Sequence, residues 1–267
     1  MPVFSSAALR SSVASRLRAA GCVFAEDEAR ILLSAAASPA ELAAMVRARA
    51  DGRPLEHVVG WAEFAGLRIA VDPGVFVPRR RSEFLAAAAT ALTGPPRGPG
   101  AVVLDLCCGS GALAAAVAAG AAHPIELHAA DTAPDAVRCA RRNLAGTAAA
   151  VHQGDLFDAL PEALRGRVDV LIANVPYVPT GDIALLPPEA RLHEARPALD
   201  GGADGLDVLR RVAAAAPAWL APGGSLLFET SERQVATALA VTRAAGLTAE
   251  ASRQEDLDAT VVTATLR

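Results

Sequence analysis

Apolar residues follow a helical period in the first fifth of the chain. Up to about residue 50 they recur three and four residues apart, as on one face of an α-helix. The pattern predicts three helices, at 11–20, 26–37 and 39–50. Ser38 and Glu41 form a capping-box pattern at the start of the third helix, and Asp51 precedes the glycine that ends it. Helices this short bury little surface alone, so we expect them to pack together.

The next stretch changes to short extended segments. Residues 61–71 predict a β-hairpin, and residues 75–79 predict a further extended segment. Ser82 is placed to cap a helix that runs to about residue 92. Residues 93–100 are rich in glycine and proline, which is typical of a linker.

From residue 101 onward, strand and helix patterns alternate. Strands are predicted at 101–106, 125–131, 149–153, 168–173, 225–229, 249–253 and 260–266. Helices are predicted at 112–119, 134–144, 206–220 and 234–245. This alternation implies right-handed crossovers and a doubly wound sheet. We therefore predict an α/β protein, with a helical module and hairpin in residues 1–74 and a seven-stranded domain in residues 75–267.

Composition and charge narrow the classes of function. All 25 basic residues are arginine, which excludes lysine Schiff-base chemistry and a Walker-type lysine. No apolar run is long enough to span a membrane, no secretory signal is visible, and the four cysteines lack metal spacing. We expect a cytoplasmic protein without a metal site. The net charge of −4 argues against a broad nucleic-acid surface, although residues 79–81 could form a local basic patch.

Polar residues directly follow the fourth strand of the alternating part. Residues 168–173 are almost continuously apolar, as in a parallel strand buried on both faces, and Pro176 ends the strand near Asn174. In open α/β sheets, ligands bind at the carboxyl ends of the strands. Asn174 carries an acceptor and a donor there, and Tyr177 adds a flat face and a hydroxyl. The plainer interpretation is a simple exit from strand to loop.

Acidic residues and glycines follow the three preceding strands. Residues 105–111 read Asp-Leu-Cys-Cys-Gly-Ser-Gly, and glycines there let the main chain approach a ligand closely. Asp131 ends the second strand, where a carboxylate can accept hydrogen bonds from ribose hydroxyls. Asp155 follows the third strand, as a ligand contact or as a turn residue. Residues 109–114 also match a dinucleotide fingerprint, so NAD must be considered; Asp105 instead suits a cationic amino-acid group.

Taken together, these motifs resemble a known family. The acid and glycines at 105–111, Asp131, Asp155, and Asn-x-Pro-Tyr at 174–177 are similar to class I S-adenosylmethionine-dependent methyltransferases. Within that class the chain resembles the protein-glutamine methyltransferases that modify peptide chain release factors. The segments that carry this narrower resemblance are 51–60, 77–83 (Pro-Arg-x-x-Ser-Glu), 194–199 and 201–206.

Three positions depart from the pattern of that family. Val175 stands where the family has the first proline of Asn-Pro-Pro-Tyr, and Cys107 stands where it has the first glycine of the turn. The segment between residues 33 and 47 is shorter. Because the helical module contributes to substrate recognition in the family, this shortening bears on the release-factor assignment more than on methyl transfer.

The resemblance implies a Rossmann-like fold, S-adenosyl-L-methionine as cofactor, and a protein acceptor with an exposed glutamine. The implied cofactor residues are Asp105, Cys107, Gly109, Gly111, Asp131, Asp155, Leu156 and Asn174. The implied acceptor residues are Asn174, Val175, Pro176 and Tyr177.

The acceptor chemistry leaves other functions open. An amide nitrogen is a poor nucleophile, so the enzyme must hold its NH2 with two acceptors: the Asn174 side-chain oxygen and a main-chain carbonyl, which Val175 can supply. The exocyclic amine of adenine has the same geometry, so a DNA or RNA adenine methyltransferase is the nearest alternative. A non-catalytic cofactor-binding module and an NAD-dependent oxidoreductase are further alternatives.

Overall fold

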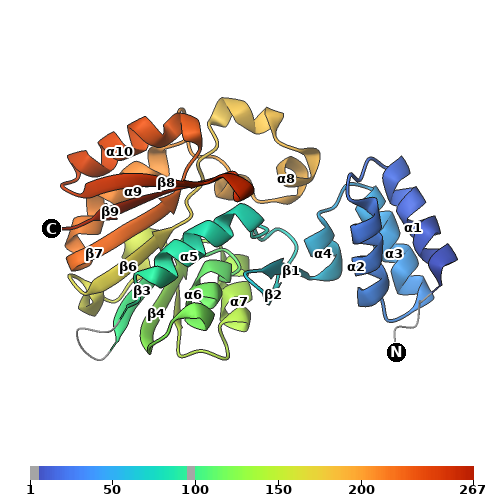
Figure 1. Cartoon of the computed structure of the whole chain (residues 1–267), viewed down its shortest axis with the longest axis horizontal. Coiled ribbons are helices and arrows are strands. Elements are labelled where there is room, and N and C mark those ends of the chain that lie inside the picture. The colour runs from blue at the N-terminus through green and yellow to red at the C-terminus, as the bar shows by residue number, and fades with distance from the viewer. Residues whose placement is uncertain (1–5, 95–99) are drawn as a thin grey trace.

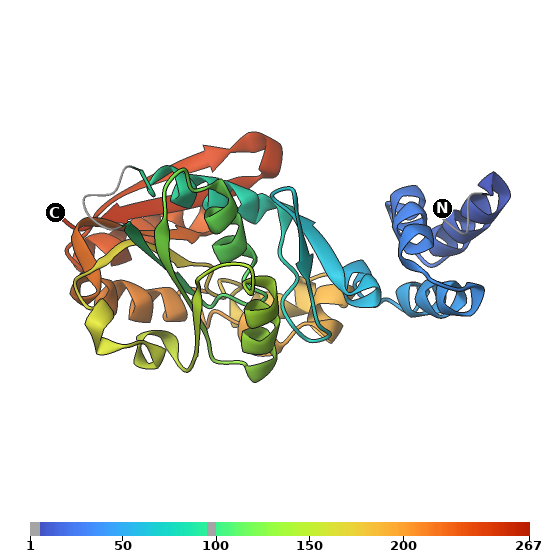
Figure 2. The same ribbon diagram turned by 90° about the horizontal axis from the view of Figure 1, so that it is seen from below.

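The N-terminal part of the chain is a bundle of short helices with its own core. The computed structural model describes residues 6–94 and 100–267, so most of the predicted linker at 93–100 lies outside the described residues. The helices are α1 (Ala7–Ala19), α2 (Ala25–Ala35), α3 (Pro39–Ala50) and α4 (Leu55–Val59). Buried Leu17, Leu32 and Val46 pack together in this bundle. Figures 1 and 2 show α1–α3 set apart from the remainder, with α4 leading into it.

Local sequence signals explain where these helices begin and end. The Oγ atom of Ser38 accepts a hydrogen bond from the main-chain N–H of Glu41 at 3.2 Å, as the capping box predicts. The Glu41 carboxylate reaches the N–H of Ala37 at 2.7 Å rather than that of Ser38. Gly60 adopts φ of +80° and ends α4, a conformation that costs glycine little.

The predicted hairpin follows the bundle and packs on the larger α/β part of the chain. Strands β1 (Trp61–Phe64) and β2 (Leu67–Ala70) pair in antiparallel fashion through a turn at Ala65 and Gly66. Both turn residues have positive φ, as expected of a two-residue hairpin loop. The hairpin contacts helix α7 (Pro134–Asn143). The division of the chain at residue 74 stays a prediction.

A seven-stranded sheet forms the centre of the larger part. Its strands are β3 (Ala101–Leu106), β4 (Ile125–Asp131), β5 (Ala150–Gln153), β6 (Val168–Ala173), β7 (Leu220–Glu229), β8 (Thr248–Gln254) and β9 (Ala259–Thr265). Their order is β5-β4-β3-β6-β7-β9-β8, with β9 antiparallel to both neighbours and the other pairs parallel. All seven predicted strands are confirmed.

Helices cover both faces of the sheet. Helices α5 (Glu83–Ala91), α6 (Ala112–Gly120) and α7 share one apolar core with Val103 and Ile172 of the sheet. Helices α9 (Asp207–Ala215) and α10 (Val235–Ala244) share the other with Leu104 and Leu171. Helix α8 (Pro188–His193) lies in the long connection after β6, on the side that faces the bundle (Figure 1).

Two local predictions require correction. Ser82 does not cap a helix: residues Arg80–Ser82 form one 3-10 turn before α5, and the Ser82 hydroxyl bonds Glu229 instead. The helix predicted at 206–220 ends at Ala215, because Pro217 cannot continue its hydrogen bonding, and β7 begins at Leu220. Within the described ranges, no helix is both long enough and apolar enough to span a membrane.

Candidate active site

A cavity of about 680 Å³ lies at the carboxyl ends of β3, β4 and β6. That volume falls in the range of small-molecule sites and leaves room for two reactants. Most of the residues singled out from the sequence line it: Cys107, Gly109, Asp131, Asp155, Leu156, Asn174, Val175, Pro176 and Tyr177. The sheet thus brings together side chains that are up to 70 residues apart.

The turn after β3 is tied to the end of β4. The Asp131 carboxylate accepts hydrogen bonds from the N–H of Gly109 and the N–H of Ala133, both at 2.9 Å. Cys107 adopts φ of +55°, the left-handed conformation that a glycine would adopt more readily. Burial raises the pKa of the Cys107 thiol to about 12, and the nearby carboxylates reinforce this. The thiol is therefore protonated at neutral pH and is no nucleophile.

Two residues expected to touch the cofactor lie behind the cavity wall. Asp105 is fully buried, does not line the cavity, and accepts the N–H of Ala114 in α6 at 3.1 Å. Burial raises its pKa to about 7, with Asp131 adding to the effect. Gly111 does not line the cavity either; a Cβ atom there would lie 3.1 Å from the Cβ of Ala140 in α7. Asp105 therefore braces the turn from within, and Gly111 permits close helix packing.

Asp155 has a partner that the sequence pattern did not indicate. Its carboxylate pairs with Arg211 of α9 at 2.7 Å, and both side chains are about half exposed. Arg211 also lines the cavity. Leu156 is 7% exposed and adopts φ of +49°, which turns the chain at the cavity floor.

The part of the cavity lined by residues 174–177, where the methyl acceptor is expected, is called the acceptor end. It carries hydrogen-bonding groups that have no partner among the described residues. Among the described residues, none forms a hydrogen bond with the Asn174 side chain or donates one to the Val175 carbonyl. Val175 is 2% exposed as a residue, packs with the core and also lines the cavity. A side-chain oxygen and a main-chain carbonyl next to each other can hold both hydrogens of a planar NH2 group.

Tyr177 is fixed by a buried carboxylate. Its hydroxyl donates a hydrogen bond to Glu229 Oε1 at 2.7 Å and accepts one from Arg81 at 2.7 Å. Glu229 is 3% exposed and also binds Arg81 Nε at 2.7 Å and the Ser82 hydroxyl at 2.6 Å. Burial raises the pKa of Tyr177, and Glu229 adds to this effect. The ring therefore has a fixed position, and its hydroxyl stays protonated.

The loops beside the acceptor end are joined by similar contacts. Arg79 pairs at 2.5 Å with Glu194, whose side chain is fully buried. The Gln234 Nε2 atom donates at 2.9 Å to the main-chain carbonyls of both Tyr177 and Asp204. A Cβ at Gly201 would lie 2.7 Å from the Pro176 carbonyl, which explains why glycine is needed there. The segments at 77–83 and 201–206 thus lie against residues 174–177, and the segment at 194–199 is joined to the first of these through Arg79 and to Val178 through the Leu199 carbonyl.

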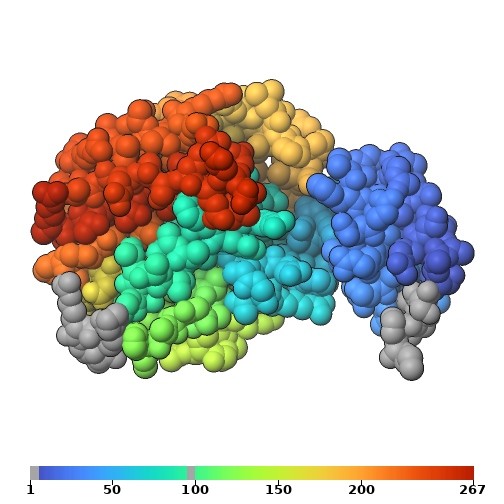
Figure 3. All heavy atoms as spheres, in the orientation of Figure 1, coloured from blue at the N-terminus to red at the C-terminus, as the bar shows by residue number. Residues whose placement is uncertain are grey.

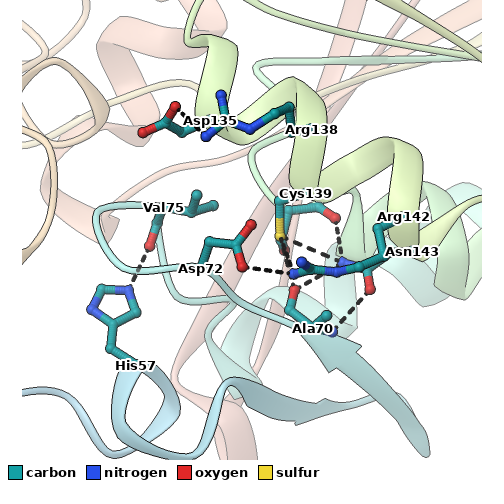
Figure 4. A network of polar contacts seen from close by, with 10 residues as sticks. His57, Ala70, Asp72, Val75, Asp135, Arg138, Cys139, Arg142 and Asn143 are labelled. Carbon is teal, nitrogen blue, oxygen red and sulfur yellow. Dashed lines mark hydrogen bonds and ion pairs between the residues drawn. The ribbon is translucent and has the colours of Figure 1, made fainter.

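The side chain of Asn143 joins the glycine turn to the hairpin, and Figure 4 shows its contact with Ala70 of the hairpin. Asn143 ends α7, and its Oδ1 accepts the Ala70 N–H at 2.9 Å while its Nδ2 donates to the Ala70 carbonyl at 2.8 Å. The same Nδ2 donates at 2.8 Å to the carbonyl of Ser110, which lines the cavity. Arg142 binds Asp72 at 2.8 Å beside it. The amide of Asn143 thus completes the edge of β2 and holds the turn after β3.

Sequence reasoning missed Arg211, Glu229 and Asn143. Glu229 closes β7, so its position at a strand end was a usable signal. Arg211 lies within α9 and Asn143 is the last residue of α7; polar helix residues normally face solvent, and nothing in the spacing of these two distinguishes them.

Comparison with known proteins supports the fold. The sequence model of the methyltransferase small domain family matches residues 66–203. A 16S rRNA N2 methyltransferase from Thermus thermophilus, crystallised with AdoMet and guanosine, aligns with a TM-score of 0.55 at 22% identity, covering 78% of this chain and 50% of its own. A methyltransferase from Pyrococcus furiosus aligns with a TM-score of 0.53 at 16% identity, covering 75% and 88%.

Curated relatives match more of the sequence. A release factor glutamine methyltransferase from Geobacter sulfurreducens is 39% identical over 207 residues, covering 76% of this chain and 70% of its own. One from Cereibacter sphaeroides is 38% identical over 275 residues and covers 94% of each. A 4-amino-L-phenylalanine/4-methylamino-L-phenylalanine methyltransferase from Streptomyces pristinaespiralis is 41% identical over 214 residues, covering 78% and 71%.

The fold, the cavity at the strand ends and these matches define a class I methyltransferase that uses S-adenosyl-L-methionine. The donor set fits that cofactor, since the Asp131 carboxylate stands where hydroxyls can be held and apolar Leu156 and Leu113 stand beside it. Within the class, the chain belongs to the release factor glutamine methyltransferase family. The predictions of fold class, family, enzyme type and cofactor are confirmed.

Proposed function

We propose that this enzyme methylates the side-chain amide nitrogen of a glutamine in a peptide chain release factor. The observation that supports the proposal most is the pair of unengaged acceptors, the Asn174 side-chain oxygen and the Val175 carbonyl, at the acceptor end of the cavity. The names of its relatives supply the class of acceptor protein.

Asn174, Val175 and Tyr177 act by orienting the glutamine side-chain amide. Two acceptors on one NH2 group fix its plane, so that the nitrogen lone pair points into the cofactor part of the cavity. The Tyr177 ring, held by Arg81 and Glu229, gives the planar amide a flat surface. Well-aligned intramolecular reactions gain on the order of 7 to 11 kcal/mol from positioning alone. No group has to remove a proton before the nitrogen reacts: the new carbon–nitrogen bond forms as the carbon–sulfur bond breaks, and the nitrogen then releases one of its protons to solvent.

Bound S-adenosyl-L-methionine supplies an electrophilic methyl group on a positively charged sulfur. In the proposal, Gly109, Asp131, Asp155 and Leu156 hold this cofactor, with Asn174 between cofactor and acceptor. Asp105, Cys107 and Gly111 shape the turn on which it rests.

Replacement of Asn174 tests the mechanism. Asn174→Ala should lower the turnover rate at saturating cofactor and acceptor by roughly a hundredfold or more, the scale seen when one positioned polar group is removed. Asn174→Asp keeps an acceptor and should retain more activity than Asn174→Ala. Cofactor affinity is measured separately by calorimetry, so that binding and turnover are distinguished. An Asn174→Ala enzyme that works at the parental rate would overturn the mechanism.

The acceptor class needs its own test, because adenine and aromatic amines carry a similar conjugated nitrogen. Wild-type enzyme is offered a release factor, an adenine-containing oligonucleotide and 4-amino-L-phenylalanine, and methyl transfer is followed by mass spectrometry. We expect an added 14 daltons on glutamine of the release factor. Transfer to adenine alone would contradict the proposal, and binding of cofactor without any transfer would favour a non-catalytic module.

A further inference from the structure

An ion pair joins helices α1–α3 to the larger part of the chain. The guanidinium of Arg49, in the last turn of α3, binds Glu189 of α8 at 3.0 Å. Among the described residues, this is the one ion pair between helices α1–α3 and the chain beyond residue 60. Figure 3 shows the bundle as a separate lobe beside the α8 region.

Arg49 is held in place from within the bundle. Its Nε and second terminal nitrogen bind the two carboxylate oxygens of Glu28 at 2.7 and 3.0 Å. The side chains of Arg49 and Glu28 are only 11% and 10% exposed. A further N–H donates to the carbonyl of Arg53 at 3.0 Å. A guanidinium with this many fixed partners presents its remaining donors in one direction.

No shared apolar core holds the lobe in position. The buried residues of the bundle pack with one another and with α4, and none of their described apolar partners comes from beyond residue 59. Domains joined without a large apolar interface move relative to each other by default. The lobe orientation therefore depends on α4 and on the pair between Arg49 and Glu189.

One exposed apolar side chain lies a helical turn from Glu28, and another lies a turn from Glu189. Phe24 is 70% exposed and precedes Glu28 by one helical turn; Leu192 is 67% exposed and follows Glu189 by one turn. Residues three and four apart lie on the same helix face. Helix α8 also contributes Glu189 and Ala190 to the cavity lining, so the ion pair adjoins the acceptor entrance.

We propose that Arg49 and Glu189 form a salt-sensitive latch that holds the bundle beside the cavity entrance and thereby sets the affinity for a protein acceptor. The inference rests on the proposed function for the identity of that acceptor. Both are positioning residues: they act on the place where a folded protein docks, and a short glutamine peptide does not need them. The Arg49 side chain is mostly buried and that of Glu189 is 42% exposed, so the pair is only partly shielded from salt.

Charge reversal at Glu189 tests the latch. In Glu189→Arg, two cations face each other while the pair of Arg49 with Glu28 is kept. Because Glu189 also lines the cavity, a short glutamine peptide serves as the internal reference. We expect KM for the release factor to rise about tenfold more than KM for the peptide. Glu189→Asp keeps a carboxylate opposite Arg49, so its KM for the release factor should stay close to that of wild type. Glu232→Gln, which breaks a surface pair with Arg253, is the matched control and should change neither KM.

Small-angle X-ray scattering provides a measure that needs no acceptor. The radius of gyration should increase in Glu189→Arg, and in wild type when salt is raised to about 0.5 M, because screening weakens the pair. Unchanged scattering in both cases would overturn the latch, as would an equal rise of KM for protein and peptide. Should wild type methylate no glutamine, the proposed function fails and the scattering still decides the latch.

Discussion

Cys107 occupies a main-chain conformation better suited to glycine. At φ of +55° any side chain with a Cβ atom is strained, by about 1 to 2 kcal/mol. Cys107→Gly relieves the strain, whereas Cys107→Ala retains it and removes the same sulfur. We expect the glycine variant to be more stable than the alanine variant by about 1 kcal/mol in urea unfolding. Equal stability of the two, with cofactor binding intact, would show that the turn holds no strain.

The buried carboxyl of Asp105 makes stability depend on pH. Its pKa is about 7 in the folded protein, against an ordinary value of 3.8, so between these values the folded state holds a proton that the unfolded state has lost. Its contribution to stability therefore falls as pH rises from about 4 to 7. Asp105→Asn keeps an oxygen for the Ala114 N–H, and its side chain neither gains nor loses a proton in this pH range.

We expect the unfolding free energy of Asp105→Asn to depend less on pH over this window than that of wild type. Urea unfolding at several pH values measures the difference. Asp182→Asn, at an exposed position, is the control and should keep the wild-type slope. Parallel curves for wild type and Asp105→Asn would contradict the assignment.

At the scale of helices and strands, the side-chain amide of Asn143 joins the hairpin, helix α7 and the glycine turn. Asn143→Asp keeps the acceptor for the Ala70 N–H but sets a carboxylate against the carbonyls of Ala70 and Ser110. The variant loses the two hydrogen bonds that Asn143 Nδ2 donates, and it places a carboxylate against two carbonyl oxygens. Together these changes should cost about 1 to 3 kcal/mol in stability. Because the turn is released, calorimetry should also show cofactor affinity reduced about tenfold.

The neighbouring Arg142 offers a matched comparison for this prediction. Arg142→Gln removes the half-exposed pair with Asp72, which touches the hairpin and not the turn. It should cost under about 1 kcal/mol and leave cofactor affinity unchanged. A loss of affinity in Arg142→Gln as large as in Asn143→Asp would mean that the whole hairpin contact, rather than the amide, controls the turn.

At the scale of the whole molecule, the spacing of apolar residues predicted the helices and strands well, because residues that face the core recur at the period of each element. The seven strands and the position of Asn174 follow from local patterns, since a parallel sheet aligns its strand ends. Contacts such as Arg81 with Glu229, 148 residues apart, leave no local pattern. Asp105 shows a different limit of motif reasoning: the structure places this motif residue outside the cavity lining, and its contact with the cofactor stays a prediction.

The order of the strands has a consequence for how the protein is made. Strand β9 lies between β7 and β8, although residues 259–265 are synthesised after every other strand. During translation, β7 has an open edge and β8 has no partner until those residues emerge. Long-range pairing of this kind is slow and leaves edges exposed to aggregation. The N-terminal bundle, built from local contacts, can form early, whereas the sheet that carries the site is completed last.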